Sequence, residues 1–251
     1  MIEKAFRFLR ESLINPSDRV VEFSDQDDQD RIFIIDDKGQ ASEVKPSFDF
    51  IADEPLVINT LTGFVNYVLE GYDRLDASLI VHVKDEKTVH LTSGLFPNGE
   101  RELVVEANAI VPRFHYDRFL DMEELNISLQ SKFTQTEDRD ILLKVIGNIK
   151  EENVRATGDD GTSQAVTIKQ GVASVADVKV PNPVRLAPYR TFLEVDQPSS
   201  DFIFRMKDGP RGAIFEADGG AWRNQAIVNV RDYLEKELEE EIANGRITLI
   251  A

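Results

Sequence analysis

The chain contains no cysteine among its 251 residues. It therefore forms no disulfide, thiolate metal site or thiol nucleophile, and a cytoplasmic location is the simplest expectation. Long apolar runs are also missing, since none approaches the roughly 18 residues that indicate a membrane span. The first residues, MIEKAFRFLRESL, interleave charged and apolar side chains. This pattern predicts an amphipathic helix over residues 2–14, not an export signal.

Histidine is scarce, and the three copies show no HxH, HxxxH or HExxH spacing that would present a local metal pair. His82 and His90 fall on neighbouring predicted strands and could meet across a hairpin, one exposed and one half-buried. The chain also lacks a phosphate-binding loop, a dinucleotide fingerprint and a GxSxG nucleophile elbow. We therefore expect no catalytic residue, no cofactor and no resident metal.

Basic residues are few for a chain of this size: 29 Lys and Arg stand against 46 Asp and Glu, a net charge of −17. Nucleic acids require a basic footprint, so direct nucleic-acid binding is not expected. Solubility is the ordinary role of such a charge. A surface that binds a basic protein partner, or imitates nucleic acid, is the sharper alternative.

Strand and helix patterns occur in runs, not in alternation, which favours an α+β fold with mainly antiparallel sheets. A central helical pair is predicted by FLDMEELNISLQSKF and TEDRDILLKVIGNI, and a long C-terminal amphipathic helix by residues 221–243. A further helix is predicted over residues 59–72. The predicted strands are RVVEFSD, RIFIIDD, SLIVHVKD, TVHLTSG, ERELVVEANAI, NVRAT, SQAVTIKQGV, YRTFLEVDQ, DFIFRMKDG, GAIFEAD and RITLIA.

We expect one α+β domain over residues 1–251. If it divides into two lobes, the helical centre is the best seam, with an acidic lobe over 1–134 and a second lobe over 135–251. The sequence FEADGGAW then reads as a joint between a strand and the last helix. Asp218 can cap that helix, the two following glycines permit the change of direction, and Trp222 can anchor the first turn.

A mixed-charge region lies between Arg185 and Arg223, where six basic and six acidic residues balance within a strongly acidic chain. Alternation along the predicted strands places several of them on one sheet face, which we call the mixed-charge face. An ordinary cross-strand ion network is one interpretation. A ligand or partner face is the functional one, and its candidate residues are Arg190, Glu194, Arg205, Glu216 and Trp222.

The alternative to a ligand or partner face is a metal site in the N-terminal part of the chain. Metal-dependent nucleases often place an acid on one strand and Glu-x-Lys on the next, so that carboxylates hold Mg²⁺ near a lysine. Here Asp36 or Asp37 precedes Glu43 and Lys45 across a predicted hairpin. Both aspartates fall at the turn and Pro46 ends the second strand, which weakens the match.

Three segments carry a family resemblance: DDGTSQAVTIKQGV, NPVRLAPYRTFLEVDQPSSDFIFRM, and AIFEADGGAW with the amphipathic run after it. Over about residues 78–243 the chain resembles prophage-encoded proteins of the YfdQ-like family of unknown function. The family has no motif tied to a reaction, so no residue role is carried over. The resemblance implies a phage or prophage protein that acts inside the bacterial host cell.

We therefore favour a non-enzymatic, acidic phage protein that self-associates into a homo-oligomer and binds a host or phage protein partner. It would counteract host defence by partner binding, by sequestration of a small anionic ligand held by Arg190 or Arg205, or by DNA mimicry. A Mg²⁺-dependent nuclease, or an accessory factor in phage DNA recombination, is the alternative. No membrane partner is expected.

Overall fold

The structure is a computed structural model in which the chain divides into two compact units. The first unit comprises residues 1–53 and 94–102, and the second comprises 54–93 and 103–251. Residues on both sides of the 134/135 seam belong to the second unit. The structure describes residues 19–24, 30–36, 38–44, 52, 54–71, 78–96, 99–148, 154–159, 164–170, 173–174, 178–207 and 211–251. The helix expected over residues 2–14 lies outside these ranges. Within them, no helix has both the length and the apolar composition that a membrane span requires.

The first unit contains a three-stranded antiparallel sheet. Its strands are β1 (Arg19–Ser24), β2 (Asp30–Ile35) and β3 (Ala41–Val44), in that order. The strands expected at RVVEFSD and RIFIIDD are confirmed, and their branched residues suit a pleated sheet. A tight turn at Asp36 returns the chain from β2 to β3.

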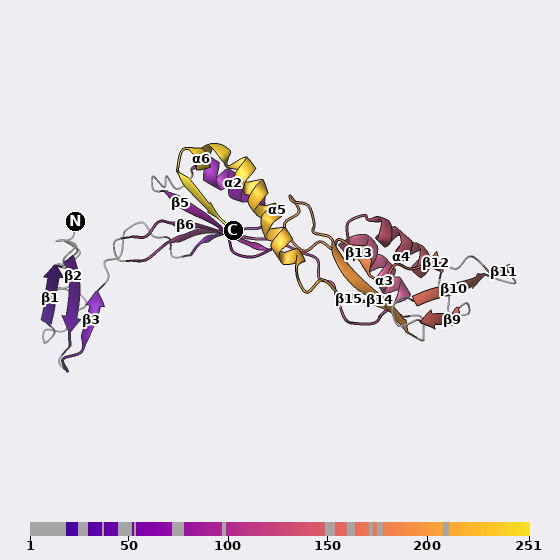
Figure 1. The fold of residues 1–251 in the computed structure, drawn as a ribbon. Helices are drawn as coiled ribbons and strands as arrows, with labels where there is room; N and C mark the ends of the chain where they lie inside the picture. Colours follow the sequence, from indigo (N-terminus) through magenta and orange to yellow (C-terminus); the bar gives the residue numbers. More distant parts are fainter. Residues whose placement is uncertain are drawn as a thin grey trace. The chain divides into compact units, whose positions relative to one another are not determined.

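The second unit contains a five-stranded sheet with the order β16–β5–β6–β7–β4 (Figure 1). Its centre is the predicted antiparallel meander of β5 (Leu79–Val83), β6 (Thr88–Ser93) and β7 (Leu103–Asn108). At its edges, β4 (Leu56–Ile58) pairs in parallel with β7, and β16 (Ile247–Ile250) pairs in parallel with β5. Strands distant in sequence thus close both edges of a locally formed meander.

Alternation along the meander separates a core face from an open face. Val81 and Leu91 on the core face are fully buried. His82 and His90 lie directly opposite each other on the other face, with ring centroids 6.4 Å apart. The predicted cross-strand meeting is confirmed, with His82 exposed and His90 half-buried.

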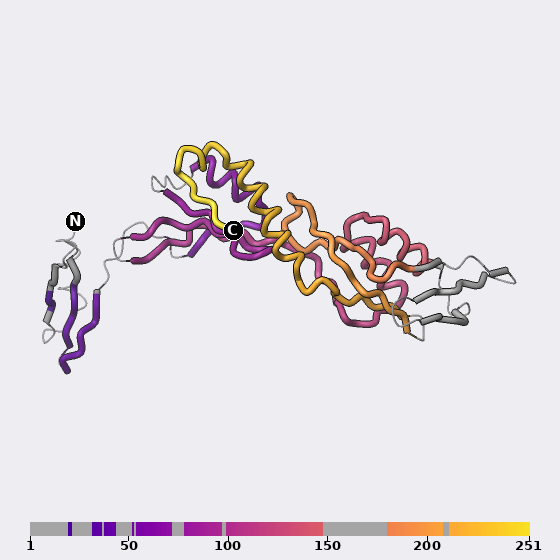
Figure 2. The backbone as a smooth tube through the Cα atoms, in the orientation of Figure 1, coloured from indigo at the N-terminus to yellow at the C-terminus, as the bar shows by residue number. Residues whose placement is uncertain are grey.

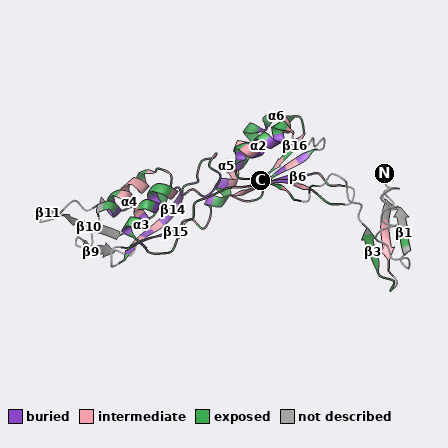
Figure 3. Ribbon diagram, turned by 180° about the vertical axis from the view of Figure 1, so that it is seen from behind, coloured by how far each residue is buried: buried purple, intermediate pink, exposed green. Residues whose placement is uncertain are grey.

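Two helices pack on the core face of this sheet, α2 (Leu61–Glu70) and α5 (Trp222–Glu237) (Figures 1 and 3). The Thr60 hydroxyl caps α2 by accepting the N–H of Gly63. A Cβ at position 63 would lie 2.9 Å from the side chains of Ile58 and Thr60, so only glycine fits this close approach. Glycine is therefore required at position 63, in the first turn of α2.

The single long C-terminal helix expected over residues 221–243 is wrong. The 16-residue helix α5 ends at Glu237, and α6 (Glu239–Ala243) follows after a break at Leu238, whose φ is −111° and ψ is 20°. Five glutamates lie within residues 235–241, and like charges four positions apart disfavour a continuous helix. Leu238 remains 1% exposed in the same core as α5.

A second sheet in this unit has the order β13–β14–β15–β8 and is antiparallel throughout. Its strands are β13 (Val184–Leu186), β14 (Ser200–Lys207), β15 (Arg211–Glu216) and β8 (Leu120–Asp121). The predicted helical pair, α3 (Met122–Lys132) and α4 (Glu137–Asn148), packs on it around a second hydrophobic core. Asp121 caps α3, and Thr136 accepts the N–H of Arg139 in the first turn of α4.

A third group of strands pairs around β10 (Gln164–Gln170). Its partners are β9 (Val154–Asp159), β11 (Ala173–Ser174) and β12 (Val178–Lys179), all antiparallel to it. The whole arrangement is α+β with mostly antiparallel sheets, as the sequence predicts.

Candidate ligand-binding site

The segment between β13 and β14 carries Arg190 and is an irregular loop, so the strand expected at YRTFLEVDQ is wrong. Gln197 organises this loop: its Oε1 accepts the backbone N–H groups of Arg190 at 2.8 Å and Thr191 at 3.2 Å. Its Nε2 donates to the carbonyl of Phe192 at 2.9 Å. Phe192 is 1% exposed and packs in the core of the five-stranded sheet. Side-chain hydrogen bonds thus replace the ladder that a strand would form.

Arg190 is a buried cation whose two terminal nitrogens are both anchored. Its side chain is 6% exposed, and its Nη1 lies 3.2 Å from Oε1 of Glu216. Its Nη2 donates to the carbonyl of Pro198 at 3.1 Å and to the hydroxyl of Ser200. Burial lowers the pKa of Arg190, while the nearby Tyr116 and Glu216 act to raise it. The guanidinium remains charged, because arginine keeps its proton in proteins.

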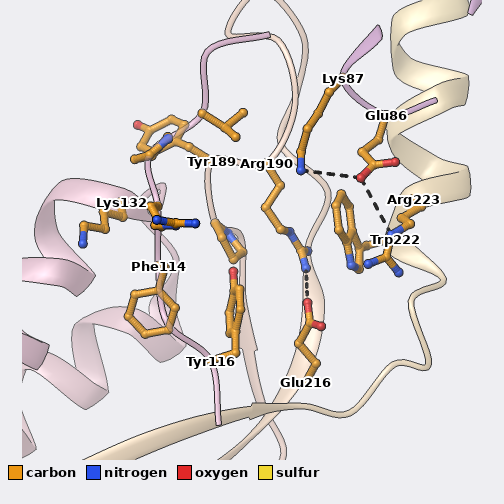
Figure 4. A pocket seen from close by; sticks show the side chains of 14 residues that line it. Glu86, Lys87, Phe114, Tyr116, Lys132, Tyr189, Arg190, Glu216, Trp222 and Arg223 are labelled. Atoms are coloured by element: carbon orange, nitrogen blue, oxygen red, sulfur yellow. Dashed lines mark hydrogen bonds and ion pairs between the residues drawn. The ribbon is translucent and has the colours of Figure 1, made fainter. Parts of the chain in front are cut away.

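Trp222, the only tryptophan and the first residue of α5, packs between two guanidinium groups (Figure 4). Cζ of Arg190 lies 3.9 Å from the Trp222 ring centroid, and Cζ of Arg223 lies 4.8 Å from it. Both distances suit cation–π attraction, and planar guanidinium groups stack well on aromatic rings. We call Arg190, Trp222 and Arg223 the arginine–tryptophan stack.

The joint that precedes Trp222 folds as the sequence predicts. Oδ1 of Asp218 accepts the N–H of Gly220 at 3.0 Å, and Oδ2 accepts the N–H of Trp222 at 3.3 Å. Gly219 and Gly220 have φ values of 62° and 84°, which glycine adopts without strain. The backbone trace passes directly from β15 through this joint into α5 (Figure 2). The joint therefore fixes Glu216 and Trp222 on the same side of the pocket.

Glu86, in the turn between β5 and β6, completes the stack at its other end. Its Oε1 lies 3.7 Å from Nζ of Lys87 and 3.7 Å from Nε of Arg223. Its backbone carbonyl accepts a hydrogen bond from the hydroxyl of Thr191. This turn is therefore attached both to the Arg190 loop and to α5.

Tyr116 and Phe114 form an aromatic wall across Arg190 from Trp222 (Figure 4). The Tyr116 ring stacks on Phe202 with centroids 5.7 Å apart and an interplanar angle of 11°. Phe114 contacts Tyr116 edge-on, with centroids 4.8 Å apart. Burial raises the pKa of Tyr116 to about 12, so its hydroxyl stays protonated at neutral pH.

These groups line a half-open cavity of about 400 Å³, which we call the Arg190 pocket. Its volume lies within the range of about 300–1,000 Å³ that small-molecule sites occupy. The lining residues are Glu86, Lys87, Val111, Pro112, Arg113, Phe114, Tyr116, Lys132, Pro188, Tyr189, Arg190, Glu216, Trp222 and Arg223.

The charge of the pocket opposes that of the chain. Five lining residues are cationic and two are carboxylates, a net of +3, whereas the whole chain carries −17. Arg190, Arg223 and Lys87 are paired with the two carboxylates. In the part of the chain that the structure describes, neither Arg113 nor Lys132 pairs with a carboxylate. The pocket thus holds positive charge that the carboxylates of the described residues do not pair with.

Two buried N–H donors in the pocket wall have no acceptor among the described residues, Nε1 of Trp222 and Nε of Arg190. Trp222 is 5% exposed and Arg190 is 6% exposed. A buried donor without a partner costs about 1–3 kcal/mol. Both atoms have less than 1 Å² of accessible surface, so they lie behind the surface of the cavity and not on it.

The other two residues expected on the mixed-charge face lie elsewhere. Glu194 accepts the backbone N–H of Thr62 at 3.2 Å, in the first turn of α2. Arg205 lies opposite Ala213 in the β14–β15 ladder, on the sheet face opposite to buried Phe204. The cross-strand ion network on one sheet face is therefore wrong, because Arg190 lies in a loop and Arg205 lies on the face opposite to Phe204. Of the five predicted residues, the structure brings together Arg190, Glu216 and Trp222.

Two residues of the alternative metal site, Asp36 and Glu43, lie in the described part of the chain. Oδ1 of Asp36 accepts the backbone N–H groups of Lys38 at 2.9 Å and Gln40 at 2.8 Å, so it serves the turn. Glu43 is exposed on β3 opposite Phe33. Asp37 and Lys45 lie outside the described residues. Across the described ranges, no group of three or more His, Asp or Glu side chains could hold a metal ion.

The sequence interpretation missed most of the pocket. Glu86, Arg113, Tyr116 and Lys132 come from segments that lie up to 137 positions from Arg223 in the sequence. The run RFHYDRF, which mixes basic and aromatic residues, was the one local signal. Long-range pairing of elements decides which of these residues meet.

Comparison with protein-family models, with curated proteins and with solved structures gives no match for this chain. The resemblance to the YfdQ-like family therefore stays a prediction. The site is interpreted from its own geometry.

Proposed function

We propose that this chain is a non-enzymatic binding protein that sequesters a small anionic ligand in the Arg190 pocket. The observation that carries the proposal is the net charge of +3 around a 400 Å³ cavity within a chain of −17. An acidic surface repels anions in general, so a local cationic cavity selects those small enough to enter it. Sequestration was one of the functions expected from the sequence.

The cationic residues of the pocket fall into two groups, those that pair with a carboxylate and those that do not. Arg190 and Arg223 are fixed by stacking on Trp222 and by their ion pairs, so they shape a rigid wall. Arg113 and Lys132 keep their charge unpaired among the described residues and are available to an incoming anion. A hydrogen bond to a charged group contributes about 1.5–3 kcal/mol, which makes these two residues the main source of affinity.

The wider setting rests on the sequence. An acidic phage or prophage protein that removes a small signal molecule from the host cell would counteract host defence. Self-association and binding of a host or phage protein remain part of this proposal, since one chain can carry a ligand pocket and a protein-binding surface.

Isothermal titration calorimetry with ribose 5-phosphate, inorganic phosphate and uncharged ribose tests the proposal. We expect ribose 5-phosphate to bind with an affinity that falls as salt is added, and ribose not to bind. Arg113→Gln and Lys132→Gln should each weaken binding about 10-fold or more, because each removes one charge-assisted contact.

Lys236→Gln is the matched control. It removes the same charge as Lys132→Gln from an 81% exposed side chain at the other end of α5, roughly 20 Å from Trp222 along the helix. It should leave binding unchanged. If none of the anions binds, or if the control weakens binding as much as the pocket variants do, the proposal is wrong.

A further inference from the structure

The Arg190 pocket is rich in flat side chains, which sharpens the chemistry of its ligand. Four of the fourteen lining residues are aromatic: Phe114, Tyr116, Tyr189 and Trp222. Two guanidinium planes stand beside them in the arginine–tryptophan stack. An aliphatic anion would leave these planes without contact. A planar conjugated ring would use them, because bases stack both on aromatic side chains and on arginine planes.

Tyr189 differs from the other aromatic residues of the pocket in its ring contacts. Phe114 and Tyr116 contact each other and the core rings of Phe133 and Phe202. Tyr189 is half-buried, and its ring makes no aromatic or cation contact with any residue that the structure describes. Its backbone is fixed, since its N–H donates to the carbonyl of Lys132 at 2.9 Å. Tyr189 is therefore the lining aromatic residue that we expect to stack on a ligand.

Charge and flat surface together indicate a ligand with an anionic end and a planar conjugated end. We propose that the Arg190 pocket binds a nucleoside phosphate, with the phosphate at Arg113 and Lys132 and the base against Tyr189 and the arginine–tryptophan stack. This inference rests on the proposed function and specifies its ligand class. It concerns a single small nucleotide, because the acidic remainder of the chain repels a nucleic-acid strand.

Three probes separate this inference from the general proposal: AMP, ribose 5-phosphate and adenosine. Calorimetry should give AMP an affinity about 5- to 150-fold higher than ribose 5-phosphate, the gain expected for one base stacked on aromatic side chains. Adenosine should bind at least about 10-fold more weakly than AMP, because it lacks the charged group. Equal binding of AMP and ribose 5-phosphate would overturn the nucleotide inference and leave anion binding intact. If none of the three binds, both proposals fail.

The chain itself supplies a positional readout. Trp222 is its only tryptophan, so AMP bound in the pocket should change the intrinsic fluorescence with the same dissociation constant that calorimetry gives. Calorimetric binding without a fluorescence change would place AMP outside the pocket and overturn the inference.

A matched pair of variants tests the stacking surface. Tyr189→Ala should remove most of the advantage of AMP over ribose 5-phosphate, while Tyr189→Phe, which keeps the ring, should retain it. Ribose 5-phosphate affinity reports whether the pocket is intact in both variants. If Tyr189→Ala keeps both the ribose 5-phosphate affinity and the full AMP advantage, the base does not stack there and the assignment is wrong.

Discussion

The β2–β3 turn and the Arg190 pocket both contain several charged side chains, but the partners of those side chains come from different distances along the sequence. At the turn, Asp36 is satisfied by two backbone N–H groups within four residues of itself. In the pocket, Arg190 makes an ion pair, two hydrogen bonds and a cation–π contact. Its partners, from several segments of one unit, are Glu216, Pro198, Ser200 and Trp222. Short sequence spacing is therefore enough to build a turn, whereas a cavity with unneutralised charge needs long-range assembly.

Because the two regions differ in solvent exposure, losing a contact should cost less free energy at the turn than in the pocket. The backbone groups that Asp36 serves are exposed, and water can replace its carboxylate there. Arg190 is 6% exposed, and its partners have no comparable substitute. Removing one member of a buried pair leaves an uncompensated charge, which is much more costly than losing an exposed contact. The two regions should therefore respond to substitution with different magnitudes.

Among the substitutions considered, Arg190→Met should lower the free energy of unfolding most. It keeps a long apolar side chain on Trp222 but leaves Glu216 and the acceptors on Pro198 and Ser200 without their donor. We expect a loss of about 3 kcal/mol in the free energy of unfolding, the lower end for a broken buried pair, because the Glu216 side chain is 33% exposed. Denaturant unfolding followed by Trp222 fluorescence measures it, and this single tryptophan reports on the second unit.

The double variant Arg190→Met, Glu216→Gln checks the cause. If the ion pair carries the effect, removing the carboxylate as well should recover at least about 1 kcal/mol, since close charge pairs show such coupling. A loss within about 0.5 kcal/mol of zero for Arg190→Met, typical of surface substitutions, would remove the contrast between the pocket and the turn.

Local patterns predicted the elements of the fold because those elements depend on nearby residues. The strands of the meander, the helical pair and the Asp218 joint all follow from alternation, helical spacing and capping chemistry. The parallel pairings of β4 and β16 did not follow, because they join segments far apart in sequence. The break at Leu238 and the loop around Gln197 also depend on side-chain interactions that propensity does not describe.

The candidate site was predicted only in part, because local patterns relate only some of its residues to one another. Glu216 and Trp222 flank one joint, so their proximity was readable from the sequence, and a strand pattern happened to add Arg190. That pattern also added Glu194 and Arg205, which the structure places elsewhere. Tyr116 and Glu86 reach the pocket through tertiary packing, and no local spacing relates them to Arg190.

The raised pKa of Tyr116 should make the stability of the protein depend on pH, and we expect an effect between those of Arg190→Met and Asp36→Ala. Burial raises the pKa of Tyr116 to about 12, above the ordinary value of 10.0. The unfolded chain therefore loses this proton first, so the stabilising contribution is present below pH 10 and is lost as the pH rises toward 12. Wild-type protein should lose stability over this window faster than Tyr116→Phe. Denaturant unfolding of both proteins between pH 9 and pH 12 measures the difference, and parallel curves would mean that Tyr116 ionises normally.

Asp36→Ala should have the smallest effect, because its contacts are local and exposed. We expect a loss of about 0.5–1 kcal/mol, confined to the turn. Hydrogen exchange at the backbone N–H groups of Lys38 and Gln40 should accelerate about 3- to 5-fold, while Trp222-monitored unfolding stays unchanged. Asp36→Asn, which keeps an acceptor oxygen, should restore most of the protection. A loss in the second unit comparable to that of Arg190→Met would show that the acidic turn has a role beyond its own hairpin.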